Sequence, residues 1–93
     1  MAGQPIRRSV YYSGRVQGVG FRYTARKIAQ NYAVSGFVRN LPDRRVELVV
    51  EGEAEEIQRF LIDLAETMRD NIHDAQTTQA TPTGEFSGFE IRH

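Results

Sequence analysis

The 93-residue sequence contains no cysteine, and this absence excludes three kinds of site. A chain without thiols can form no disulfide scaffold, no thiolate metal site and no thiol nucleophile. No apolar run approaches the roughly 18 residues that a membrane-spanning helix requires. No apolar stretch follows Met1 in the way that a secretory signal would, so a cytoplasmic protein is the default expectation.

A net charge is also absent, because twelve basic residues balance twelve acidic ones. The two signs are nevertheless separated along the chain. Residues 1–45 contain nine basic residues and one acidic residue, whereas residues 46–93 contain three basic and eleven acidic residues. The basic half suggests a surface for an anion, but a net charge of zero weakens non-specific affinity for nucleic acid.

Apolar periodicity predicts two helices, each with one buried face. The first face consists of Phe21, Ala25, Ile28, Ala29 and Tyr32, and the second of Ile57, Phe60, Leu61, Leu64, Ala65 and Met68. Residue types typical of strands occupy residues 6–13, 35–40, 46–50, 75–81 and 89–92. Of these, residues 75–81 are the most polar.

This order of elements, β-α-β-β-α-β with a short terminal strand, predicts an α+β fold of the ferredoxin-like type. In such a split βαβ sandwich an antiparallel sheet carries both helices on one face. The first and third strands lie at its centre, with the second strand beside the third. No linker or repeat divides the chain, so we expect one domain over residues 1–93, with residues 1–5 as a flexible tail. The fold hosts many unrelated activities and does not decide the function.

The loop between the first strand and the first helix has the character of a phosphate site. Its segment GRVQGVGFR, residues 14–22, contains three glycines and leads directly into the helix. Glycines allow successive N–H groups to turn inward, and the helix N-terminus favours an anion. The spacing matches neither the dinucleotide fingerprint nor the nucleotide P-loop. Arg22 stands in the first helical turn, where a cation is unfavourable unless an anion binds beside it.

The segment GRVQGVGFR, together with GFVRN at residues 36–40, VE at residues 46–47 and GEFSGF at residues 84–89, closely resembles the acylphosphatases. The resemblance covers about Ser9 to Arg92. It implies a hydrolase that cleaves the carboxyl–phosphate bond of acyl phosphates without a cofactor or a metal. It further implies that Asn40 holds the attacking water and that Arg22 binds the phosphoryl group. Backbone N–H groups of the loop would bind the phosphoryl group together with Arg22. They are the N–H groups of Arg15, Val16, Gln17, Gly18, Val19, Gly20 and Phe21.

The residues alone support a site with so few groups. The leaving carboxylate is the base of an acid with a pKa of about 4–5, so it needs no proton to depart. Catalysis can then depend on holding the phosphoryl group and orienting one water. The only histidines, His73 and His93, form no ligand pair, and we interpret both as surface residues without a role. Asn40, taken without the family, is typical of an ordinary turn.

Three departures from the family pattern bear on the expected rate and fold. Arg44 stands where the family commonly has a glycine after the turn aspartate, so the hairpin turn must differ or tolerate strain. Leu41 replaces a threonine that often follows the water-holding asparagine, which predicts a lower rate. The polar residues 75–81 predict a strand at the edge of the sheet.

Two other classes of function remain open at this point. One is a non-catalytic domain that binds an acyl or carbamoyl phosphate. The other is an RNA-binding module of the same fold, to which GFRY at residues 20–23 is faintly similar, although its position before the helix argues against it. The prediction is therefore a monomeric enzyme for a small acyl phosphate, with phosphate or sulfate as a competing anion, and with no nucleic acid or membrane partner.

Overall fold

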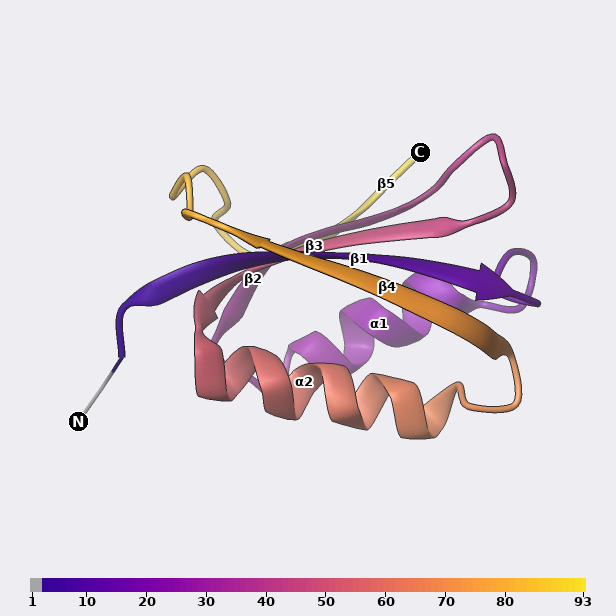
Figure 1. Ribbon diagram of the computed structural model, residues 1–93, viewed down its shortest axis with the longest axis horizontal. Helices are drawn as coiled ribbons and strands as arrows, with labels where there is room; N and C mark the ends of the chain where they lie inside the picture. The colour runs from indigo at the N-terminus through magenta and orange to yellow at the C-terminus, as the bar shows by residue number, and fades with distance from the viewer. Residues whose placement is uncertain (1–2) are drawn as a thin grey trace.

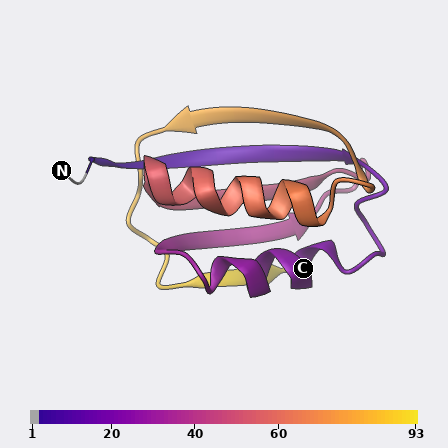
Figure 2. The same cartoon turned by 90° about the horizontal axis from the view of Figure 1, so that it is seen from below.

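The secondary-structure elements follow the predicted order in a computed structural model, which describes residues 3–93 (Figure 1). The elements are β1 (Pro5–Gly14), α1 (Phe21–Ala29), β2 (Val34–Asn40), β3 (Val46–Glu53), α2 (Ala54–Thr67), β4 (Ile72–Ala80) and β5 (Phe89–Arg92). Both helices lie on the same face of the sheet, as Figure 2 shows. None of the helices in this part of the chain is long and apolar enough to cross a membrane.

The five strands form one sheet in the order β4-β1-β3-β2-β5. The central position of β1 and β3, the neighbouring position of β2 and the edge position of β4 confirm the predictions. The expected antiparallel sheet needs one correction, because β5 runs parallel to β2. The reason is the connection between the strands, because β4 ends at the end of the sheet where β2 begins. The chain then crosses the sheet at that end, so β5 starts beside the start of β2 and runs in the same direction.

The core lies between the helices and the sheet. From the sheet it contains the alternate residues Val46, Leu48 and Val50 of β3, none of which is exposed. From the helices it contains the predicted apolar faces, including Phe21, Ala25, Ile57, Phe60 and Leu64. Phe21, the first residue of α1, packs its ring 4.9 Å from that of Tyr12 at the end of β1. This contact fixes the start of α1 against the end of the first strand.

Several boundaries differ from the expected ones. Strand β4 begins at Ile72, three residues before the predicted strand, because it pairs with β1 as far as Gly14. Of the predicted tail, residues 1–2 lie outside the described residues, whereas Pro5 already pairs with Glu53 in β1. Ala65, placed on the buried face of the second helix, is exposed and lines an open groove between α2 and the strands β1 and β4.

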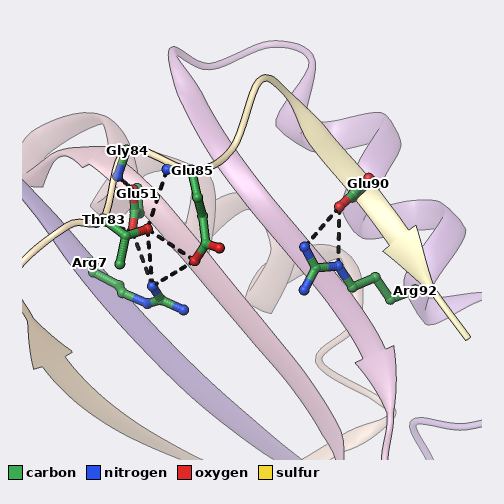
Figure 3. A network of polar contacts seen from close by, with 7 residues as sticks. All are labelled: Arg7, Glu51, Thr83, Gly84, Glu85, Glu90 and Arg92. Atoms are coloured by element: carbon green, nitrogen blue, oxygen red, sulfur yellow. Dashed lines mark hydrogen bonds and ion pairs between the residues drawn. The ribbon is translucent and has the colours of Figure 1, made fainter.

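A buried carboxylate holds the loop that crosses from β4 to β5. Glu51, on the sheet face without helices, accepts hydrogen bonds from the N–H groups of Thr83 at 2.8 Å and Gly84 at 3.0 Å. It also accepts one from the Thr83 hydroxyl at 3.1 Å, and the Arg7 guanidinium lies 3.4 Å away (Figure 3). Burial by itself would raise the pKa of the Glu51 carboxyl. The hydrogen bonds from Thr83 and Gly84 and the charge of Arg7 have a larger effect in the opposite direction, so the pKa of Glu51 lies below the ordinary glutamate value.

This network predicts an acid-sensitive contribution to stability. At neutral pH, Glu51→Gln is expected to lower the free energy of unfolding by about 2 kcal/mol, because the charged acceptor is lost. Since the pKa of Glu51 is lower in the folded chain, its contribution is present above the ordinary glutamate pKa. It is lost as the pH falls through the folded value. Urea unfolding of both proteins at neutral pH and near pH 3 measures this, and Glu85→Gln, at the exposed partner of Arg7, is the control. If the free energies of unfolding of the wild type and Glu51→Gln differed by the same amount at both pH values, this prediction would be contradicted.

Candidate functional site

The predicted loop and the predicted water-holding residue lie at the same end of the sheet. Val46, the first residue of β3, pairs with Tyr12 of β1 on one side and with Asn40 of β2 on the other. Neighbouring strands are about 4.8 Å apart, so the ends of β1 and β2 lie roughly 10 Å from each other. The loop that leaves β1 needs only to turn back to α1 to face Asn40.

The first hydrogen bond of α1 runs from the Thr24 N–H group to the Gly20 carbonyl at 2.9 Å, so the N–H groups of residues 21–23 have no partner within the helix. Gly20 is the residue before α1 and has φ 77°, and Gly18 has φ 76°, a conformation that residues with a Cβ rarely adopt. No side chain caps the helix, and its first turn contains no acidic residue. The free N–H groups and the helix dipole therefore favour an anion at this position.

The side chain of Gln17 ties the loop to the hairpin between β2 and β3. Its Nε2 donates to the carbonyl of Leu41 at 2.8 Å and to the carbonyl of Arg45 at 2.9 Å. Val16, beside it, is 1% exposed and anchors the loop in the core. The local sequence predicts a contribution only from the backbone of Gln17 and gives no signal for this side-chain contact, because both acceptors are carbonyls that lie more than 20 residues away in the chain.

The backbone of Arg15 has a different partner from the one the resemblance implies. Its N–H donates to the carbonyl of Asn71 at 2.9 Å, at the turn that leads into β4. This hydrogen bond occupies an N–H group that the resemblance assigns to the phosphoryl group. The N–H groups of residues 16–21 are not bound in this way.

Arg22 and Asn40 line one pocket of about 310 Å³, which is also lined by Val16, Gly18, Gly20, Phe21, Tyr23, Arg26, Ile91 and His93. Asn40 is half-buried, and its side-chain amide makes no hydrogen bond to any of residues 3–93. The pocket thus brings together a guanidinium, free N–H groups and an unengaged amide. Arg15, Gln17 and Val19 belong to the same loop but do not line it. Within residues 3–93, no group of three or more His, Asp or Glu side chains is placed to hold a metal ion.

The end of β5 contacts Arg22, which sequence reasoning did not anticipate. The guanidinium donates to the carbonyl of Arg92 at 3.3 Å, and it lies 3.2 Å from Nδ1 of His93. His93 is exposed, as expected of a surface residue, but it lines the pocket and contacts Arg22. No local pattern could have revealed this, since the contact depends on β5 crossing to lie beside β2. His73 is exposed on β4 and does not line the pocket.

The hairpin that carries Asn40 tolerates the expected strain. Arg44 has φ 76° and is the one non-glycine residue with positive φ among the described residues. The turn is closed by the N–H of Leu41 donating to the carbonyl of Arg45 at 2.8 Å. The Asp43 carboxylate accepts hydrogen bonds from both the backbone and the side chain of Arg45, and these hold the pKa of Asp43 below its ordinary value. Arg39, next to Asn40, is paired with Glu47.

The comparisons with known proteins agree with this arrangement. A model of the acylphosphatase family matches residues 8–91. An acylphosphatase of Rubrobacter xylanophilus is 44% identical, and the alignment covers 98% of this chain and 84% of that protein. An acylphosphatase of Roseiflexus sp. is 43% identical over 91% of this chain and 92% of that protein. The crystal structure of an acylphosphatase from Bacillus subtilis superposes with a TM-score of 0.83 at 28% identity, covering 95% of this chain and 99% of that chain. Fold, loop and sequence therefore agree, and the chain belongs to the acylphosphatase family, the enzymes that hydrolyse acyl phosphates.

Proposed function

We propose that acyl phosphate hydrolysis takes place in the pocket at the start of α1, with Arg22 as the phosphoryl-binding side chain and Asn40 as the residue that orients water. One observation carries this proposal: Arg22 and the unengaged amide of Asn40 line the same pocket beside an uncapped helix N-terminus. N–H groups of Val16, Gln17, Gly18, Val19, Gly20 and Phe21 would bind the phosphoryl oxygens together with the guanidinium. Arg15 is left out of this set because its N–H is bound to Asn71.

The proposed reaction is a single displacement at phosphorus. The water held by Asn40 forms a bond to phosphorus while the bond between phosphorus and the acyl oxygen breaks. The carboxylate leaves as an anion, because its acid has a pKa of about 4–5 and no proton donor is needed. A phosphate oxygen of the substrate takes the proton of the water. Arg22 and the N–H groups stabilise the charge on the phosphoryl oxygens during this step.

The contact between His93 and Arg22 supports the role of the arginine. A guanidinium that is held at two points loses less conformational entropy when it binds an anion. The Arg92 carbonyl and His93 Nδ1 provide those two points, and both come from the end of β5. The loop fixed by Glu51 delivers β5 to this position, so we assign to that buried network an indirect part in ordering the site.

A hydrolysis assay tests the proposal and separates it from a non-catalytic binding domain. Benzoyl phosphate is expected to be hydrolysed at an undiminished rate in the presence of EDTA, and inorganic phosphate is expected to inhibit competitively because it occupies the phosphoryl site. A folded sample that binds phosphate without turnover would instead support the binding domain. Loss of activity in EDTA would show that the proposed step is incomplete.

Four further expectations from the sequence stay proposals. We place the protein in the cytoplasm as a monomer, and we expect sulfate to compete in the same way as phosphate. We also expect no nucleic-acid partner. The net charge of zero supports this last point, because affinity for a phosphate backbone depends on accumulated positive charge.

A further inference from the structure

The pocket extends beyond the space that a phosphoryl group needs. It encloses about 310 Å³, whereas a water molecule in the liquid takes up about 30 Å³ and a phosphoryl group takes up only a few times that volume. The surplus lies along α1, because Tyr23 and Arg26 line the pocket together with Arg22. Part of the acyl portion of a substrate held at Arg22 would lie in this part of the pocket.

Arg26 is a second cation on the same wall. Residues four apart in a helix lie on one face, about one turn or roughly 5–6 Å from each other, so Arg26 follows Arg22 along the pocket. Its side chain is half-buried, and its guanidinium lies 5.6 Å from the centre of the Tyr23 ring. No aspartate or glutamate lines the pocket, so the field along this wall is positive.

Several arginines lack a carboxylate partner within residues 3–93, but among them only Arg22 and Arg26 line this pocket. Arg7, Arg39, Arg45, Arg59 and Arg92 each have a carboxylate within 4.0 Å. Arg26 has no such partner among residues 3–93, although it is less exposed than its neighbour Lys27. Both residues lie in the last turn of α1, where a cation is favourable. The helix dipole therefore accounts for both charges equally, but only Arg26 lines the pocket.

We propose that Arg26, with the ring of Tyr23 beside it, forms a second anion subsite that favours acyl phosphates with an additional anionic group on the acyl portion. The additional group, a carboxylate or a second phosphate, would lie about one helical turn from the phosphoryl group. The Tyr23 ring, on a side chain that is 60% exposed, offers an apolar surface for the carbon atoms between the two anions. This inference rests on the proposed function of the pocket, because Arg22 must hold the phosphoryl group for Arg26 to meet the acyl group.

The test compares two substrates that differ at one ring substituent, which is charged in one and uncharged in the other. The substrates are 4-carboxybenzoyl phosphate and 4-methylbenzoyl phosphate, whose rigid rings prevent the carboxylate from attacking its own acyl phosphate. Arg26→Gln is expected to lower kcat/KM for the carboxylated substrate by about tenfold, because a charge-assisted hydrogen bond is lost, and to leave the methyl substrate unchanged. Arg26→Lys keeps the charge and is expected to keep most of the preference. Lys27→Gln, which removes the neighbouring charge outside the pocket, is the matched control and should change neither substrate.

Binding of 4-carboxybenzylphosphonate and 4-methylbenzylphosphonate, measured by calorimetry, separates this inference from the proposed function. If the chain binds both phosphonates but hydrolyses neither acyl phosphate, the catalytic proposal fails. The subsite is then judged by whether Arg26→Gln weakens the carboxylated phosphonate alone. If Arg26→Gln weakened the binding of both phosphonates equally, the proposed subsite would be overturned. An equal effect of Arg26→Gln and Lys27→Gln on the carboxylated compound would also overturn it.

Discussion

Arg22→Ala is expected to lower kcat/KM for acyl phosphate hydrolysis by about a thousandfold or more and to abolish detectable phosphate binding. Arginines that stabilise a transferring phosphoryl group contribute rate factors of about 10³–10⁵. The position of Arg22 explains such a loss: it is the charged side chain beside the uncapped N–H groups of α1, and the end of β5 holds it there. The backbone N–H groups that remain carry no formal positive charge, so they stabilise the negative charge that develops on the phosphoryl oxygens less well than the guanidinium does.

The measurement combines steady-state kinetics with calorimetric binding of inorganic phosphate. Arg22→Lys keeps the charge but cannot grip two oxygens at once, so its activity should fall between those of the wild type and the alanine variant. Arg59→Ala, which removes an arginine from the exposed side of α2, should leave both readouts unchanged. Phosphate binding of wild-type strength by Arg22→Ala would show that the guanidinium does not contact the phosphoryl group.

Asn40→Ala is expected to reduce kcat by about 10²–10³-fold while phosphate binding stays close to that of the wild type, because a positioned hydrogen-bonding group contributes a factor of this size. Asn40 is the last residue of β2, and its amide has no partner among residues 3–93, so its removal breaks no internal hydrogen bond. The loop remains tied to the hairpin through Gln17 and the carbonyls of Leu41 and Arg45. The effect should therefore fall on the attacking water and not on the fold.

The separation of kcat from binding is what distinguishes Asn40 from Arg22. Asn31→Ala, at an exposed asparagine after α1, is the matched control and should change neither quantity. The stability of each variant, followed by urea unfolding, checks that the hairpin is intact. Full activity of Asn40→Ala would remove its role in orienting water, and loss of phosphate binding would place it with Arg22 at the phosphoryl group.

Much of the fold could be predicted from the sequence because its signals are local. The helical spacing of Ile57, Phe60 and Leu64 shows which face of α2 is buried, and residue types typical of strands mark β1 and β3. The parallel pairing of β5 with β2 could not be predicted in the same way, because four residues carry no signal of direction. Their direction follows from where β4 ends.

The separation of charge along the chain also has a structural outcome. The acidic first turn of α2 begins where β3 ends, beside the pairing of Glu53 with Pro5. The start of α1 lies at the other end of the sheet, beside Val46. The carboxylates of this turn thus lie away from the pocket, and most basic side chains of the first half form ion pairs or face solvent.

The sequence by itself determined the turn at residues 14–22, because these residues are contiguous and their conformation depends on glycines and on a helix that starts directly after them. Local chemistry is sufficient to describe such a segment, and the resemblance added a role for Asn40. Only the tertiary structure placed Asn40, His93 and Arg26 around one pocket and bound Gln17 to the hairpin. Those residues are far apart in the chain, and their juxtaposition arises from strand pairing and from the crossing of β5, which depend on the packing of the whole core.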